Sequence, residues 1–301
     1  MSISVKHLTK FYGEQAAVDN ISFEAKKGEI LGFLGPNGAG KSTTMKIITS
    51  FIPATEGDVE VCGLDIKKHS LEVRKKIGYL PEHNPIYLDM YVKEYLTFVG
   101  KIYKIPNLKE RVKEVIELVG LQKEQHKVTG TLSKGYRQRV GLAQAIIHDP
   151  EVLILDEPTS GLDPNQLTEI RELIKEIGKA KTVMLSTHIM QEVEAICDRV
   201  IIINNGKLVA NAKASELQSD VKSQVVFVEF DAVVSRNRLA KIPNISRVEA
   251  INETSFLINS DQSIDLRKTI AGYAKDENLL ILTIRKEEKS LEEVFKSYTT
   301  K

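Results

Sequence analysis

The sequence predicts an α/β protein with a mainly parallel sheet at its core and a smaller α+β region after it. Residues 152–155 are an uninterrupted apolar run, which is typical of a parallel strand that is covered on both faces. Strand-like and helix-like segments alternate through the first part of the chain, as in parallel α/β folds. This pattern changes after about residue 217. We therefore expect a main domain at residues 1–217 and an accessory domain at residues 218–301.

The first segment, residues 1 to about 82, is expected to contain an antiparallel β portion and then a strand–loop–helix unit. Ile21 and Phe23 alternate with polar residues, as they would in a half-buried strand. The elements expected after them are a strand at 29–34, a helix at 42–49 and a helix at 65–76. The apolar residues near helical spacing around the first of these helices are Met45, Ile48 and Phe51.

Residues 83 to about 148 are predicted to form a helical subdomain inserted in the main domain. Apolar residues at i, i+3, i+4 and i+7 give one of its helices a buried face, and Gly120 is well placed to end that helix. These apolar residues are Val112, Val115, Ile116 and Val119. A second helix has the same kind of face at Val140, Ala143 and Ile147.

Residues 149 to about 215 return to alternating strands and helices. A strand is expected at 182–187, and Asn205-Gly206 is a strong signal for a hairpin turn. The helix before this strand is expected to be lined by Leu167, Ile170, Ile174 and Ile177.

The accessory domain lacks any recognisable catalytic pattern. Its expected strands are 225–230, 246–250, 255–258 and 280–284, and its expected helices are 236–241 and 263–275. Residues 290–293 form a capping box, followed by an apolar stripe at Leu291, Val294, Phe295 and Tyr298. A packing or dimerisation module is the favoured interpretation, and regulation or contact with a partner remain as alternatives.

Composition restricts the classes of function. The 301 residues carry a net charge of only +1 and no basic stripe, so we expect no nucleic-acid partner. Cys62 and Cys197 are far apart, which suits a reducing compartment and two small buried thiols. We expect neither a signal peptide nor a membrane span, because no run approaches the roughly 18 apolar residues that spanning requires. Any membrane function would then depend on another chain.

A glycine-rich loop at residues 35–42 follows the pattern G-x-x-x-x-G-K-[ST]. Its glycines would let backbone N–H groups face phosphates, Lys41 would reach the β- and γ-phosphates, and the Ser42 hydroxyl would bind Mg²⁺. A glycine-rich turn that only caps a helix is the alternative. The residues expected to contact ATP here are Gly35, Pro36, Asn37, Gly38, Ala39, Gly40, Lys41, Ser42 and Thr43.

Two carboxylates follow the apolar strand at 152–155. Asp156 would bind magnesium directly or through water, and Glu157 is placed to polarise an attacking water. Two solvated carboxylates in a turn before Pro158 are the alternative interpretation.

Residues 132–139, Leu-Ser-Lys-Gly-Tyr-Arg-Gln-Arg, resemble the signature sequence LSGGQ of ATP-binding-cassette (ABC) ATPases. The resemblance extends from residue 2 to about 215, with the family's motifs in order. It implies that an aromatic residue stacks on adenine, that a D-loop follows the acidic strand, and that a switch histidine contacts the γ-phosphate. The corresponding residues are Tyr12, Asp163 in the segment 160–163, and His188. It also implies that Ser133 and Gly135 close over ATP held by a second copy.

The chain departs from the family pattern at two places. Lys134 and Tyr136 stand where the signature usually has Gly and Gln, whereas Ser133 and Gly135 are retained. The family's lid glutamine falls on Glu82, which could still bind magnesium or a water but could not donate a hydrogen bond unless protonated. An ordinary surface glutamate is the alternative for Glu82.

Segments 77–90 and 132–145 are similar to the exporter branch of the family, and most of all to the ATP-binding subunits of gliding-motility ABC transporters. The resemblance implies a Mg-dependent ATPase that works as a homodimer with composite ATP sites. Its partner would be a multi-span membrane permease on a separate chain, contacted through the helical insert. The chain would then be cytoplasmic and peripheral on the inner face of the membrane. A soluble ABC ATPase that acts on DNA or ribosomes is the alternative, whereas a P-loop kinase would not need the signature.

Overall fold

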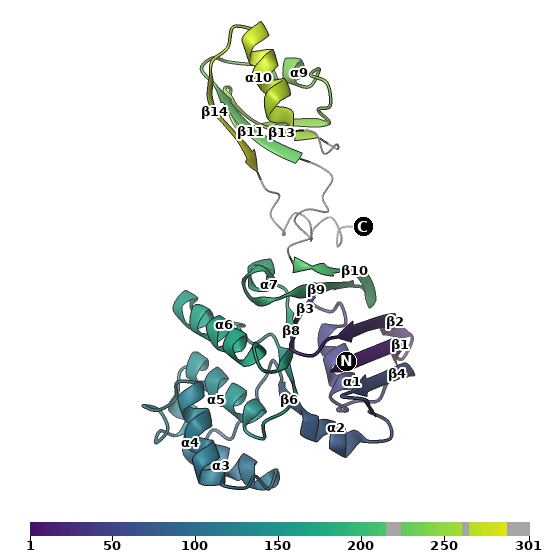
Figure 1. Cartoon of the computed structure of the whole chain (residues 1–301), viewed down its shortest axis with the longest axis vertical. Coiled ribbons are helices and arrows are strands. Elements are labelled where there is room, and N and C mark those ends of the chain that lie inside the picture. The colour runs from purple at the N-terminus through teal and green to yellow at the C-terminus, as the bar shows by residue number, and fades with distance from the viewer. Residues whose placement is uncertain (215–223, 261–264, 288–301) are drawn as a thin grey trace. The chain divides into compact units, whose positions relative to one another are not determined.

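The computed structural model describes residues 1–214, 224–260 and 265–287. The chain divides into two compact units, Met1–Ala214 and Ser215–Lys301, close to the boundary expected at residue 217. Each unit is described by itself (Figure 1).

The first unit contains an antiparallel sheet with the strand order β2-β1-β4-β5. Its strands are β1 (Ile3–Tyr12), β2 (Gln15–Ala25), β4 (Glu56–Val61) and β5 (Leu64–Asp65). Ile21 and Phe23 of β2 are both buried, as their alternation predicted. One face of this sheet packs in a hydrophobic core with helix α1 and with strands of the second sheet.

The second sheet of this unit has the order β10-β9-β3-β8-β7-β6. Strands β9, β3, β8, β7 and β6 run parallel, and β10 returns antiparallel to β9. The strands are β3 (Ile30–Leu34), β6 (Ile77–Leu80), β7 (Val152–Asp156), β8 (Thr182–Thr187), β9 (Arg199–Asn204) and β10 (Lys207–Lys213). Every residue of β3, β7 and β8 is buried, which explains why these strands read as continuous apolar runs. The β9–β10 turn is the predicted Asn205-Gly206, with positive φ at both residues.

Helices α1 (Lys41–Ile48), α2 (Ser70–Lys76), α6 (Pro164–Gly178) and α7 (Met190–Ile196) complete this part of the unit. Two predictions for this region were wrong. The predicted helix at 65–76 begins only at Ser70, because Asp65 pairs with Glu60 as part of β5. Phe51 lies beyond the end of α1 and is 73% exposed, so it is not part of the buried face formed by Met45 and Ile48.

The insert between β6 and β7 is helical, as predicted. It contains α3 (Val92–Ile102), α4 (Leu108–Leu118), a 3₁₀ turn at Thr129–Thr131 and α5 (Lys134–Ile146). Gly120, at a φ of 71°, follows the end of α4, where a left-handed residue is favoured. Figure 1 shows α3, α4 and α5 together, on the other side of the unit from strands β1, β2 and β4.

The second unit has the chain order β-α-β-β-α-β and the sheet order β12-β13-β11-β14, which is the ferredoxin-like arrangement. Its elements are β11 (Gln224–Phe230), α9 (Arg236–Leu239), β12 (Arg247–Ala250), β13 (Ser255–Ser260), α10 (Leu266–Asp276) and β14 (Ile281–Glu287). Apolar residues of both helices pack on one face of the sheet. The predicted capping box at 290–293 and the stripe from Leu291 to Tyr298 lie outside the described residues.

None of the helices in the described ranges is both long and apolar enough to cross a membrane.

Candidate nucleotide-binding site

The phosphate loop, the acidic pair and the switch histidine follow three adjacent parallel strands. Strand β8 pairs with both β3 and β7, so the carboxyl ends of all three meet at one edge of the sheet. The loop leaves β3, Asp156 ends β7, and His188 directly follows β8. Ligands of open α/β sheets bind at this edge, and the topology therefore brings together groups that are more than a hundred residues apart in sequence.

The backbone of the loop fits an anion only with glycine at position 40. Gly40 has a φ of 107° and caps α1 at its N-terminus. A Cβ at this position would lie 2.4 Å from the carbonyl oxygen of Ala17. Any other residue would therefore be strained and would also collide with backbone. The N–H groups of the first turn of α1 lie beyond this point, together with the positive end of the helix dipole.

Lys41 is buried, and its ammonium is held at the centre of the loop. Its Nζ donates to the carbonyl oxygens of Gly35 at 2.7 Å and Pro36 at 3.2 Å. The same Nζ forms an ion pair with Oε1 of Glu157 at 3.5 Å. The only cation of the loop therefore lies beside the carboxylate of Glu157.

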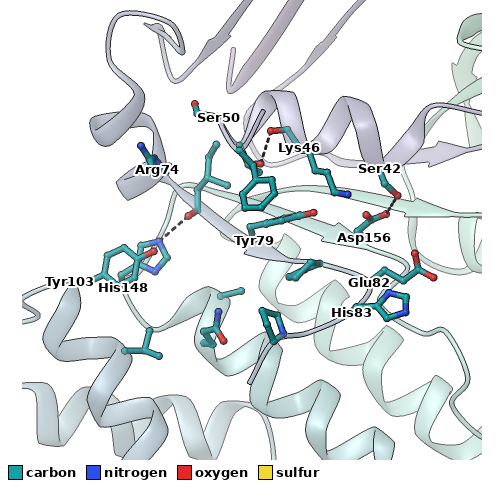
Figure 2. A pocket seen from close by; sticks show the side chains of 18 residues that line it. Ser42, Lys46, Ser50, Arg74, Tyr79, Glu82, His83, Tyr103, His148 and Asp156 are labelled. Carbon is teal, nitrogen blue, oxygen red and sulfur yellow. Dashed lines mark hydrogen bonds between the residues drawn. The ribbon is translucent and has the colours of Figure 1, made fainter. Parts of the chain in front are cut away.

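Ser42 and Asp156 provide adjacent oxygen atoms, as Figure 2 shows. Ser42 Oγ donates to Oδ1 of Asp156 at 3.1 Å, and Ser186 Oγ donates to the same oxygen at 2.6 Å. Burial raises the pKa of Tyr79, with the charge of Asp156 as a second cause, so this phenol stays neutral beside the carboxylate. Ser186 was missed by the sequence analysis, although its place two residues before His188 could have indicated it.

Glu157 and His188 form the second pair of the site. Glu157 adopts a φ of 50°, which is rare for a residue with a long side chain and is found mainly where function requires it. Its backbone N–H donates to Ser186 Oγ at 3.0 Å. Nδ1 of His188 lies 2.9 Å from Oε2 of Glu157. Within the described part of the chain, the buried Oε1 of Glu157 makes no hydrogen bond, and it faces the ammonium of Lys41 at 3.5 Å.

These groups surround a cavity of about 370 Å³. It is lined by Ala17, Asn37, Gly38, Gly40, Lys41, Ser42, Thr43, Glu82, Glu157, Ser160 and His188. A triphosphate fits this lining, because the lining offers backbone N–H groups, an ammonium and a histidine. The oxygen atoms of Ser42, Glu82 and Asp156 are the donors that Mg²⁺ prefers. No cluster of three His, Cys, Asp or Glu residues that could hold a metal occurs among the described residues, so phosphate and water oxygens would have to complete the shell.

The signature residues lie elsewhere in the unit. Ser133 caps α5 by accepting a hydrogen bond from the N–H of Tyr136. Gly135 packs against Gln166 so closely that a Cβ would lie 2.4 Å from its Oε1. Neither Ser133 nor Gly135 lines the cavity around Lys41. Because Ser133 and Lys134 are exposed, this motif faces solvent in the single chain.

The remaining predicted contacts also lie outside this cavity. Asp163 caps α6, and its carboxylate accepts a hydrogen bond from the N–H of Gln166 at 2.9 Å. Tyr12 is 52% exposed, with the ammonium of Lys10 placed 5.4 Å from the centre of its ring. An exposed aromatic ring is available for stacking, but no contact in the structure tests that role.

A second, larger cavity of about 790 Å³ lies between the sheet and the helical insert (Figure 2). Ser42, Glu82 and Asp156 line it, so it adjoins the phosphate site. At its far end the rings of Tyr103 and His148 stack with their centres 4.0 Å apart. The sequence analysis missed this cavity, because its lining comes from segments that only the fold brings together.

Comparison with known proteins agrees with this site. Residues 18–160 match the family model described as ABC transporter. The chain is 41% identical over 240 residues to the bacitracin transport ATP-binding protein BcrA of Bacillus licheniformis, covering 75% of this chain and 78% of that protein. The chain belongs to the ATP-binding subunits of ABC transporters. It is therefore an ATPase of the P-loop type, with the fold that the sequence predicted.

Two other relatives cover more of this ABC subunit. The linearmycin resistance ATP-binding protein LnrL of Bacillus subtilis is 32% identical over 304 residues, 99% of this chain and 98% of that protein. The Nod factor export ATP-binding protein I of Ralstonia nicotianae is 34% identical over 287 residues, 94% of this chain and 84% of that protein. The first of these alignments extends through the ferredoxin-like unit as well as the ATPase unit.

Solved structures show the same fold. The dimeric ATP-binding cassette MJ0796, in a post-hydrolysis state with ADP and Pi bound, matches with a TM-score of 0.65 and 26% identity. That match covers 70% of this chain and 98% of that chain. Another ATP-binding subunit of an ABC transporter matches with a TM-score of 0.67 and 27% identity, over 73% of this chain and 92% of that chain.

Proposed function

We propose that two copies of this chain close head to tail on two ATP molecules, hydrolyse them, and so drive a multi-span permease on a separate chain. The observation that carries this proposal is the separation of two complementary half-sites within one chain. Lys41, Ser42 and Glu157 line a buried phosphate cavity, whereas Ser133 is exposed and lines no part of it. A second copy can supply the missing half.

The chemistry assigned to each residue follows from its position. Lys41 neutralises charge on the β- and γ-phosphates, and Ser42, Asp156 and Glu82 are the residues that would hold Mg²⁺. When bound, that ion neutralises phosphate charge and orients the phosphate oxygens. The carboxylate of Glu157 accepts a hydrogen bond and then a proton from water, whose oxygen bonds to the γ-phosphorus as the bond from that phosphorus to the bridging oxygen breaks and ADP leaves.

His188 and the signature complete the site. His188 contacts Glu157 through Nδ1, which leaves its other ring nitrogen for the γ-phosphate. The signature of the second copy presents Ser133 and the N-terminus of α5, whose dipole favours an anion. Tyr12 stacks on adenine in this proposal, and Asp163 lies at the contact between the two copies.

We propose export as the direction of transport, with the chain held on the inner face of the membrane by its permease. The names of the relatives support export, because they include bacitracin transport, Nod factor export and linearmycin resistance. Export associated with gliding motility is the finer proposal, and it rests only on segments 77–90 and 132–145. In either case the cargo would be recognised by the permease.

The permease contact is assigned to the helical insert. Six large apolar side chains of this region are at least 40% exposed: Tyr87, Leu88, Tyr91, Phe98, Ile102 and Leu118. An exposed apolar group of this kind favours a protein partner. The cavity of about 790 Å³ between insert and sheet lies beside Glu82, so a segment bound there could sense the phosphate site.

Co-purification tests this proposal. The tagged chain should bring down a multi-span membrane protein from detergent-solubilised membranes, and Ile102→Glu should abolish this. Leu71→Glu is the matched control, because Leu71 is 65% exposed on α2 and Ile102 is 63% exposed at the end of α3. Both variants should still bind ATP. Recovery of nucleic acid in a salt-dependent manner, with no membrane protein, would instead support the soluble DNA- or ribosome-directed ATPase.

A further inference from the structure

Glu192 is a buried carboxylate that the proposed chemistry does not use. It lies on α7, it is 1% exposed, and no ion pair given by the described residues includes it. A charged group in such a place needs strong hydrogen bonds. The bonds that Glu192 makes are therefore informative about its role.

Two threonine hydroxyls satisfy this carboxylate, one on each oxygen. Thr159 Oγ1 donates to Oε1, and Thr187 Oγ1 donates to Oε2 at 2.6 Å. Both threonines are buried. Thr187 Oγ1 also accepts a hydrogen bond from the N–H of Ile189 at 3.0 Å, which fixes the turn around His188.

The positions of these threonines connect Glu192 to the reacting groups. Thr159 follows Glu157 by two residues, and Thr187 directly precedes His188. Nδ1 of His188 lies 2.9 Å from Oε2 of Glu157, so these two residues also contact each other directly. Covalent and hydrogen bonds thus form one ring, which runs from Glu157 to Thr159, Glu192, Thr187, His188 and back to Glu157.

We propose that Glu192 is a positioning residue that holds the His188–Glu157 pair in its hydrolytic geometry without touching the nucleotide. The inference rests on the proposed roles of Glu157 and His188. A carboxylate suits this task because each of its oxygens accepts one hydroxyl proton. A glutamine of the same shape has one such oxygen, so one of the two hydroxyls would have to turn and accept a hydrogen bond from the NH₂ group instead of donating.

The first test is Glu192→Gln, measured as steady-state ATP hydrolysis of the full chain. We expect kcat to fall at least tenfold, with KM within about twofold of the parent, because binding groups are untouched. Glu194→Gln is the matched control, since Glu194 lies on the same helix and is exposed. An unchanged kcat in Glu192→Gln would overturn the proposal.

A double-mutant cycle separates positioning from general stability. If Glu192 acts through His188, Glu192→Gln should reduce kcat by less than twofold in a His188→Ala background. A merely structural role would give the same fold-loss in both backgrounds, and that result would overturn the proposal. Parental rates in both His188→Ala and Glu157→Gln would refute the proposed function itself, which is a different outcome.

A second pair of variants keeps the test valid if Glu192→Gln fails to fold. Thr159→Val removes the hydroxyl proton and keeps the shape, whereas Thr159→Ser keeps the hydroxyl. We expect Thr159→Val to lower kcat at least fivefold and Thr159→Ser to restore it to within twofold of the parent. Equal rates in the two variants would contradict the ring of bonds.

Discussion

The two halves of the proposed nucleotide site differ in how many of their polar groups find partners within the single chain. On the phosphate side, Lys41, Asp156 and Glu157 are buried. Lys41 forms an ion pair with Glu157 at 3.5 Å, and Asp156 accepts a hydrogen bond from Ser42 at 3.1 Å. On the signature side, Ser133 and Lys134 are exposed at the start of α5. One half is therefore assembled by the fold of a single chain, whereas the other half is exposed to solvent in the single chain.

This difference separates residues that act within one chain from residues that act only when two chains assemble. A buried cluster formed by one chain can bind a triphosphate by itself, because its donors are already in place. The exposed half contributes only when another molecule approaches it. We therefore expect substitutions on the phosphate side to affect binding or chemistry in each chain, and substitutions on the signature side to affect assembly.

The largest effect is expected for Lys41→Ala. This change removes the loop's ammonium, which lies 3.5 Å from Glu157, and so leaves both the phosphates and a buried carboxylate without their cation. ATP turnover should fall by about 10³-fold or more, and nucleotide binding should weaken severely. Fluorescent-nucleotide titration and steady-state kinetics would measure both, with thermal unfolding as the check on folding. Normal turnover would show that residues 35–42 do not form the phosphate-binding loop.

Glu157→Gln should slow hydrolysis by about 10²- to 10³-fold and leave ATP binding intact. The amide keeps the shape of the side chain but loses the charge and basicity of the carboxylate. Single-turnover hydrolysis and equilibrium binding would separate the two effects. Hydrolysis at the parental rate would show that this carboxylate is not the base.

The smallest effect is expected for Glu82→Gln, which makes the same chemical change at another acid of the same cavity. Glu82 is exposed, and both side chains can offer an oxygen to magnesium. Turnover should stay within about tenfold of the parent, which corresponds to about 1.4 kcal/mol of barrier. This variant is also the matched control for Glu157→Gln. A collapse in rate with binding intact would give Glu82 a catalytic role instead.

Local patterns in the sequence predicted the elements of the site, and the fold determined how those elements meet. The runs before Asp156 and His188 predicted the strands that the structure contains. The order of strands β3, β8 and β7 could not be predicted in the same way, because pairing depends on contacts between distant segments.

The same limit explains the residues that were missed. Glu192 carries no recognisable motif, and its contact with Thr159 appears only when α7 is placed beside the segment that follows β7. Ser186 had only its place near His188 as a signal, and its contact with Asp156 depends on the pairing of β8 with β7. The helix predicted from residue 65 failed for a related reason. Asp65 pairs with Glu60 across a short hairpin, and this pairing overrides the local preference for a helix.

The central claim, that two chains share each ATP, is tested most directly by the mass of the Glu157→Gln variant. Size-exclusion chromatography with light scattering should give 33.7 kDa without nucleotide and twice that value with Mg-ATP. Adding Ser133→Arg should return the mass to that of the monomer while ATP still binds. Ser70→Arg, at the first residue of α2, should leave the dimer intact as a control. A Glu157→Gln protein that binds ATP, fails to cleave it and stays monomeric even at high protein concentration would contradict the shared site.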